Sequence, residues 1–160
     1  MKHDLFGSEV PDGESVDHFP DCVVSGLANP MGIAIRVHRD GDEAVARVTL
    51  GPAFEGAPGR AHGGVVAAIF DDTMGFVLTM EKQPAFTGRL TVTYRAPTPI
   101  GEELEFRAHL AEREDRKLII HGRATADTKP VADAEGIFIA IPPERFNEAA
   151  ASRASGSATA

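Results

Sequence analysis

A histidine and two glycines, His62, Gly63 and Gly64, stand directly before the longest apolar stretch of the chain. Glycine is costly inside a helix but useful where a backbone bends sharply or comes close to another group. At the start of a helix, the backbone N–H groups of these residues would lie at the positive end of the helix dipole. They could then bind an anion or a carbonyl oxygen that gains charge, although a tight turn without a ligand has the same glycine content.

Two adjacent carboxylates, Asp71 and Asp72, lie in the middle of the apolar stretch, and the nearest basic residue downstream is Lys82. A buried carboxylate is unfavourable unless a partner compensates its charge. Unpaired acids among large apolar side chains are typical of functional sites, where a carboxylate acts as a general base or a nucleophile. The alternative is that both carboxylates face a solvated groove or cap a neighbouring element.

Spacing along the helix decides whether these groups can serve one site within one chain. His62 and Asp71 are nine residues apart. On one helix this spacing separates them by about 13 Å and places them on roughly opposite faces. A two-fold dimer solves the problem, because the glycine loop of one subunit can face the aspartate of its mate. We therefore expect a homodimer, or a dimer of dimers, with shared active sites.

The surrounding pattern predicts the elements that hold these residues. Over residues 65–80, apolar side chains lie on nearly every side of a helical wheel, which indicates a buried helix. Period-two alternation indicates strands, and Asp40-Gly41-Asp42 indicates a hairpin between the first two. The predicted strands cover residues 33–38, 45–50, 90–95, 103–110, 117–125 and 131–141. The expected fold class is α+β, with a curved antiparallel sheet wrapped around one long central helix.

Composition limits the class of protein. The chain has 160 residues and a formal net charge of −8, which favours a single soluble domain and disfavours nucleic-acid binding. We expect a flexible segment over residues 1–17, a folded domain over 18–146 and a disordered Ala/Ser-rich tail over 147–160. The single cysteine, Cys22, excludes an intrachain disulfide and a Cys-rich zinc site. We recognise neither an uninterrupted apolar membrane span nor a secretory signal, so the expected location is the cytoplasm, away from membranes.

One family matches these motifs. His62-Gly63-Gly64, followed after six residues by Asp71, resembles the signature of hotdog-fold acyl-CoA thioesterases of the phenylacetate-pathway (PaaI-like) type. Asn29-Pro30-Met31-Gly32 and the strand that ends in Tyr94-Arg95-Ala96-Pro97 extend the resemblance over about residues 26–142. The resemblance implies a hotdog fold and hydrolysis of a small or medium acyl-CoA to a free acid and CoA.

The resemblance also implies a role for each matching residue. Gly63 would offer its N–H to the thioester carbonyl, and His62 would steady that turn or the carbonyl. Asp71 of the opposite subunit would attack the thioester or activate water, and Thr87 would orient the water or the carboxylate. Some relatives carry an asparagine donor where this chain has Gly56. Further candidates for substrate binding are Gly64, Asp72, Arg60, Arg89 and Arg95, the arginines as partners of the CoA phosphates.

Several alternatives stay open on the sequence. The chain could instead be a non-catalytic hotdog protein that binds acyl-CoA or an aromatic ligand, or a hotdog hydratase or dehydratase. The remaining histidines form no cluster at ligand spacing, so we expect no catalytic metal and no cofactor. Phe70, Phe76 and Phe86 could line an acyl pocket or belong to the core. The acyl preference, the choice between CoA and acyl carrier protein, and the choice between attack and base catalysis by Asp71 are undetermined.

Overall fold

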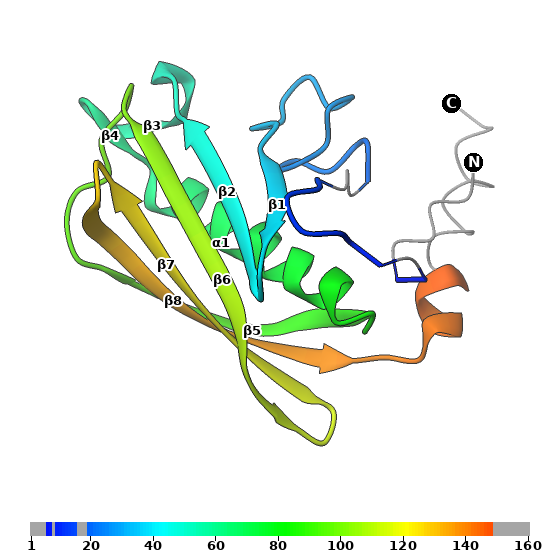
Figure 1. The fold of residues 1–160 in the computed structure, drawn as a ribbon. Coiled ribbons are helices and arrows are strands. Elements are labelled where there is room, and N and C mark those ends of the chain that lie inside the picture. Colours follow the sequence, from blue (N-terminus) through cyan, green and yellow to red (C-terminus); the bar gives the residue numbers. More distant parts are fainter. Residues whose placement is uncertain (1–5, 8, 16–18, 149–160) are drawn as a thin grey trace.

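In a computed structural model, which describes residues 6–7, 9–15 and 19–148, one helix lies against the concave side of a curved antiparallel sheet (Figure 1). Helix α1 spans Gly63–Met80. The six strands of the sheet lie in the order β1-β2-β6-β7-β8-β5. Their bounds are Arg36–Asp40 for β1, Glu43–Thr49 for β2, Ala85–Tyr94 for β5, Glu103–Glu114 for β6, Lys117–Ala126 for β7 and Lys129–Ala140 for β8. The predicted α+β class, with a sheet wrapped around one central helix, is confirmed.

Tight turns connect the strands that are neighbours in both sequence and space. Gly41, with φ of 62°, lies in the two-residue turn between β1 and β2, as the Asp-Gly signal predicts. Asp127 and Thr128 form the β7–β8 turn with φ of 46° and 66°. The sequence places the start of the first strand at residue 33, but β1 begins at Arg36, because φ of 59° at Ala34 interrupts the extended backbone.

The core lies between α1 and the concave face of the sheet. A row of small residues, Ala108, Gly122 and Ala134, crosses β6, β7 and β8 and leaves a hollow. Phe70 and Met74 of α1 occupy it, since a Cβ built on Gly122 would stand 3.0 Å from Phe70 and 2.9 Å from Met74. The fit between helix and sheet therefore depends on residues that have almost no side chain.

Of the three phenylalanines that could line an acyl pocket or belong to the core, two belong to the core. Phe70 and Phe76 have no exposed surface, whereas Phe86 on β5 is 54% exposed. By length and mean hydropathy alone, α1 would also pass as a membrane span, as core helices of globular proteins do, but half of the helix is buried in this fold. The role of α1 here is that of a core helix.

The described residues near the two ends of the chain contact the fold or each other. Residues 9–15 run beside β1, where the N–H of Gly13 donates to the carbonyl of Arg39 at 2.8 Å and Val10 is 4% exposed. Residues 143–148 are helical, and the ring of Phe146 lies 5.1 Å from that of Phe6. Residues 149–160 lie outside the described residues, so the flexible tail predicted over 147–160 stays a prediction.

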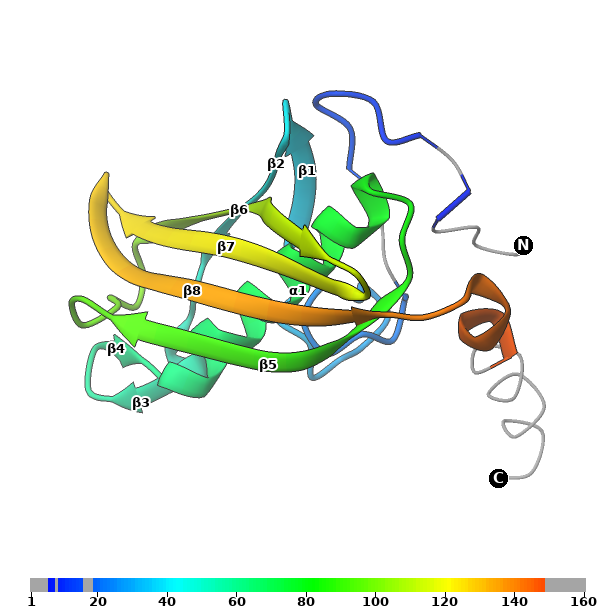
Figure 2. The same ribbon diagram turned by 90° about the horizontal axis from the view of Figure 1, so that it is seen from below.

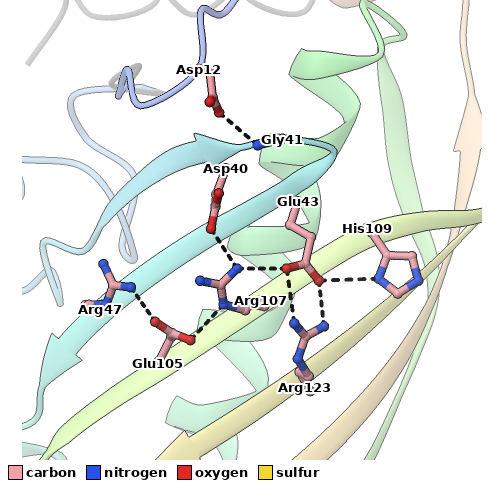
Figure 3. Close-up of polar contacts among 9 residues, drawn as sticks. All are labelled: Asp12, Asp40, Gly41, Glu43, Arg47, Glu105, Arg107, His109 and Arg123. Atoms are coloured by element: carbon pink, nitrogen blue, oxygen red, sulfur yellow. Dashed lines mark hydrogen bonds and ion pairs between the residues drawn. The ribbon is translucent and has the colours of Figure 1, made fainter.

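A network of charged side chains covers the convex face of the sheet (Figure 3). Glu43 accepts hydrogen bonds from Arg123 at 2.6 Å and from Arg107 at 2.8 Å, and the Arg123 hydrogen bond holds the pKa of Glu43 below its usual value. Arg107 also donates to Asp40 and Glu105. The network therefore joins β1, β2, β6 and β7, and its charged groups pair with one another within the sheet.

Strand β5 forms one edge of the sheet, and its outer side has no neighbouring strand within the described chain (Figure 2). It is ten residues long, and most of its residues are exposed. A long uncovered edge strand is a ready surface for pairing with another chain. This observation fits the expected oligomer.

The close contact between α1 and the sheet also predicts a cost for adding a side chain at Gly136 of β8, two residues beyond Ala134. Gly136→Ala should lower the free energy of unfolding by about 1–3 kcal/mol, because overpacking strains a dense core. The new Cβ would stand 2.5 Å from Phe138 and 2.8 Å from the sulfur of Met74. The matched control is Gly51→Ala, where a Cβ meets nothing within 4 Å. Urea denaturation measures both, and equal midpoints would contradict this packing.

Candidate active site

A small hairpin leads the chain into α1. It consists of β3 (Glu55–Ala57) and β4 (Arg60–Ala61) and follows a short 3-10 helix, η1 (Pro52–Phe54). At its tip, Gly59 has φ of 70° and donates its N–H to Glu55 Oε1 at 2.9 Å. The sequence indicates only a tight turn here, and the hairpin is additional. It holds the chain in place immediately before His62.

His62 caps the start of α1. Its Nδ1 accepts a hydrogen bond from the N–H of Gly64 at 2.9 Å, and its own N–H donates to the carbonyl of Phe54 at 2.8 Å. Because Nδ1 accepts, the neutral imidazole carries its proton on Nε2. Among the described residues, no group accepts a hydrogen bond from the N–H of Gly63, the first residue of the helix. This N–H is the one that the family resemblance implies as the donor to the thioester carbonyl.

The packing around His62 explains why Gly56 departs from the asparagine of some relatives. A Cβ on Gly56 would stand 2.8 Å from the Cα of His62 and 3.1 Å from its ring. Real Cβ atoms do not approach backbone so closely, so an asparagine would displace His62. In this chain, Gly56 lets β3 pack closely against the capping histidine. The position therefore supplies no second hydrogen-bond donor.

A cavity of about 380 Å³ opens beside the start of α1. Gly63, Arg60, Tyr94, Arg95 and Thr98 are among its lining residues. The Nε of Arg95 lies 2.6 Å from Asp133, whereas Arg60 forms no ion pair with the described residues. The cavity therefore places an available cation near the free N–H group.

Two of the proposed substrate contacts are absent from this cavity. Arg89 pairs with Glu135 at 3.3 Å, and its alternation on β5 puts it on the convex face with the paired charges. Asp72 accepts a hydrogen bond from the thiol of Cys22 at 3.4 Å, so its carboxylate points towards the segment before β1. Neither residue lies with Gly63.

Asp71 points the other way, towards β5. The hydroxyl of Thr87 donates to Asp71 Oδ1 at 2.8 Å. Burial raises the pKa of Asp71 above its usual value; the Thr87 hydrogen bond opposes this shift and the charge of Asp72 adds to it. The two residues that the resemblance pairs, Asp71 and Thr87, are thus in direct contact.

The free donor and the carboxylate are separated within one chain. Gly63 and Asp71 are eight residues apart on α1, which corresponds to a rise of about 12 Å along the helix. A carbonyl bound at one of them cannot contact the other. Within one chain, the free N–H at the start of the helix and the carboxylate in its middle therefore lie in two separate places.

Sequence reasoning did not identify the contact made by Tyr94. Its hydroxyl donates to the carbonyl oxygen of Gly63 at 2.5 Å. The signal is present in the alternation of β5, because Leu90, Val92 and Tyr94 share the face that looks towards α1. The partner atom, however, becomes evident only when strand and helix are placed together.

Known proteins resemble this chain in sequence. A family model described as the thioesterase superfamily matches residues 58–132, which include His62, Asp71 and Thr87. The bovine acyl-coenzyme A thioesterase THEM4 is 26% identical over 124 residues, which make up 75% of this chain and 51% of the relative. The mouse THEM4 is 32% identical over 94 residues, 58% of this chain and 40% of the relative. The chain thus spans about half or less of the length of these relatives.

Solved structures share the fold. A thioesterase superfamily protein, RHA08564, has a TM-score of 0.70 and 27% identity over 77% of this chain and 60% of that protein. The Escherichia coli PaaI protein has a TM-score of 0.63 and 17% identity over 67% of this chain and 83% of that one. The protein smu.793 of Streptococcus mutans, solved with acetyl CoA bound, has a TM-score of 0.60 and 18% identity over 62% of this chain and 82% of that one. The predicted hotdog fold is confirmed.

The contact between Thr87 and Asp71 predicts a shift in titration. Thr87→Val removes a hydrogen bond that lowers the pKa of Asp71, so the pKa should rise further above the ordinary value. The side-chain carboxyl 13C resonance of Asp71, followed by NMR against pH, measures the midpoint directly. Thr93→Val, which removes an exposed hydroxyl from the opposite face of β5, is the matched control. A lower or unchanged midpoint in Thr87→Val would show that the hydroxyl does not stabilise the ionised carboxylate.

Proposed function

We propose that this chain, which has the hotdog fold and matches the thioesterase superfamily model over residues 58–132, hydrolyses acyl-CoA thioesters to a free acid and CoA. The observation that carries the proposal is the pairing of a free N–H at the start of α1 with a half-buried carboxylate of raised pKa. Two findings support the substrate class: similar proteins are named acyl-coenzyme A thioesterases, and a protein of the same fold binds acetyl CoA.

The proposed chemistry uses only side chains and backbone of the protein. The N–H of Gly63 donates to the thioester oxygen, which gains negative charge as the carbonyl carbon is attacked. Asp71 takes the proton of the attacking water, or attacks the carbon itself to form an anhydride that water then hydrolyses. Because Thr87 occupies Oδ1 of Asp71, Oδ2 is the oxygen left for this step. The products in either case are the acid and the thiol of CoA.

We further propose that each active site joins two chains. Pairing of β5 with β5 of a second copy around a two-fold axis would cover the exposed edge and extend the sheet. It would also allow Gly63 of one chain to face Asp71 of the other, which the separation along α1 prevents within one chain. In this arrangement Arg60 is the better candidate for a CoA phosphate, because it lines the cavity without an ion-pair partner among the described residues.

Release of free thiol from a panel of acyl-CoAs tests the activity. Wild-type protein should release CoA, and Asp71→Asn should lower kcat by at least about a hundredfold, the usual effect of losing a positioned base. Asp72→Asn is the matched control, because it removes the neighbouring charge on the side of Cys22. Its effect should be much smaller. Binding of acyl-CoA without thiol release would support a binding protein instead, and a larger loss in folded Asp72→Asn would reverse the assignment of the two aspartates.

Mixing two inactive variants tests the shared site. Gly63→Pro removes the N–H donor at a position where the extended backbone of His62, with ψ of 132°, accepts a following proline. Asp71→Ala removes the carboxylate. In a hybrid dimer one site carries both defects, and the other keeps an intact Gly63 and an intact Asp71. Random mixing makes half the dimers hybrid, so activity should return to about a quarter of the wild-type value.

Two controls make this result decisive. Each variant alone must stay folded and inactive, and the hybrid must be confirmed by two different affinity tags. A site built from one chain would leave both sites of every hybrid broken. Folded hybrids without recovered activity would therefore exclude the shared site, as would a fully active wild-type monomer at micromolar concentration.

A further inference from the structure

The first turn of α1 is intrinsically weak. Gly63 and Gly64 are its first two residues, and each glycine costs about 1 kcal/mol relative to alanine inside a helix. An oxyanion donor, in contrast, has to be held in place before the reaction, because reorientation of the donor would consume part of its stabilising effect. Something other than helix propensity must therefore fix this turn.

Two side chains attach to the turn from outside the helix. The His62 ring accepts from the N–H of Gly64, and the Tyr94 hydroxyl donates to the carbonyl of Gly63 at 2.5 Å. Each leaves little room for a side chain on the glycine that it contacts. A Cβ on Gly64 would stand 3.0 Å from His62 Nδ1, and a Cβ on Gly63 would stand 3.2 Å from the Tyr94 hydroxyl. The glycines that loosen the turn thus admit the side chains that order it.

We propose that Tyr94 is a positioning residue. It holds the peptide between Gly63 and Gly64 by its carbonyl oxygen, and through the backbone of Gly63 it keeps the preceding N–H, the oxyanion donor, in the geometry that the reaction needs. The inference rests on the proposed thioesterase function. Tyr94 acts through the carbonyl side of Gly63 and leaves the N–H side free for the substrate. Its ring also lines the cavity at this point.

The placement of Tyr94 on β5 gives this contact a second consequence. Thr87 near the beginning of the strand contacts Asp71, and Tyr94 at its end contacts Gly63. One strand therefore fixes both halves of the site relative to the sheet. Burial raises the pKa of the Tyr94 phenol above its usual value, so the hydroxyl remains protonated and able to donate across the neutral range.

Tyr94→Phe tests the role, because it keeps the ring and removes only the hydroxyl. We expect kcat to fall about tenfold, as for one lost hydrogen bond, while KM changes by less than about twofold. The 13C resonance of the Gly63 carbonyl, recorded without substrate, should move upfield, because a hydrogen bond to a carbonyl shifts its carbon downfield. Thr93→Val, which removes a hydroxyl from the other face of the same strand, should change neither.

A double variant shows whether Tyr94 acts through Gly63. Gly63→Ala keeps the N–H but places a methyl group against the Tyr94 hydroxyl. The combined loss of kcat in Gly63→Ala with Tyr94→Phe should therefore be smaller than the product of the two single losses. Independent, multiplying effects would overturn the proposal and assign Tyr94 a separate role.

The outcomes separate this inference from the proposed function. An unchanged Gly63 carbonyl resonance in Tyr94→Phe, or an unchanged kcat in a variant whose resonance has moved, overturns the positioning role while the thioesterase activity stands. A wild-type protein that releases no thiol overturns the proposed function, and the role in that reaction with it. A fall in kcat together with the carbonyl shift supports both.

Discussion

Helix α1 fills the core and at the same time carries a half-buried carboxylate, Asp71, which is the proposed base or nucleophile. Phe70 and Met74 occupy the hollow over Gly122, while Asp71, adjacent to Phe70, turns away towards β5. Successive side chains on a helix are about 100° apart, so a residue can leave the core within one step and still stay close to apolar neighbours. Burial therefore raises the pKa of Asp71, and the basicity follows from the same packing that holds the fold together.

The edge strand β5 contacts the two parts of α1 that would form the site. It has one partner, β8, and its other edge is open in the described chain. On the face towards α1 it contacts the carboxylate through Thr87 and the first turn through Tyr94. A second copy that paired with this edge would thus add to the strand that already orders both groups, so assembly and site geometry are linked through one element.

Local sequence signals were sufficient to predict the helix and the strands. The contacts between these elements depend on tertiary structure, which the sequence pattern does not show. The Asp-Gly turn and the apolar stretch over residues 65–80 depend on neighbours in sequence, and both were found. The start of β1 was placed three residues early because the positive φ of Ala34 leaves no trace in apolar alternation. The contact of Tyr94 with Gly63, and the exclusion of a side chain at Gly56 by His62, involve residues far apart or in separate elements, and no local pattern encodes them.

The carboxylate of Asp71 also affects the stability of the fold. A carboxylate whose pKa is raised by folding binds protons more tightly in the folded chain than in the unfolded one. Its contribution to stability is most favourable at low pH, and it is lost as the pH rises from the unfolded pKa through the folded pKa. At neutral pH the ionised Asp71 therefore weakens the fold, with Thr87 offsetting part of the effect. A neutral side chain at this position would remove that cost, so packing alone does not account for a carboxylate here, whereas the proposed role of Asp71 as base or nucleophile does.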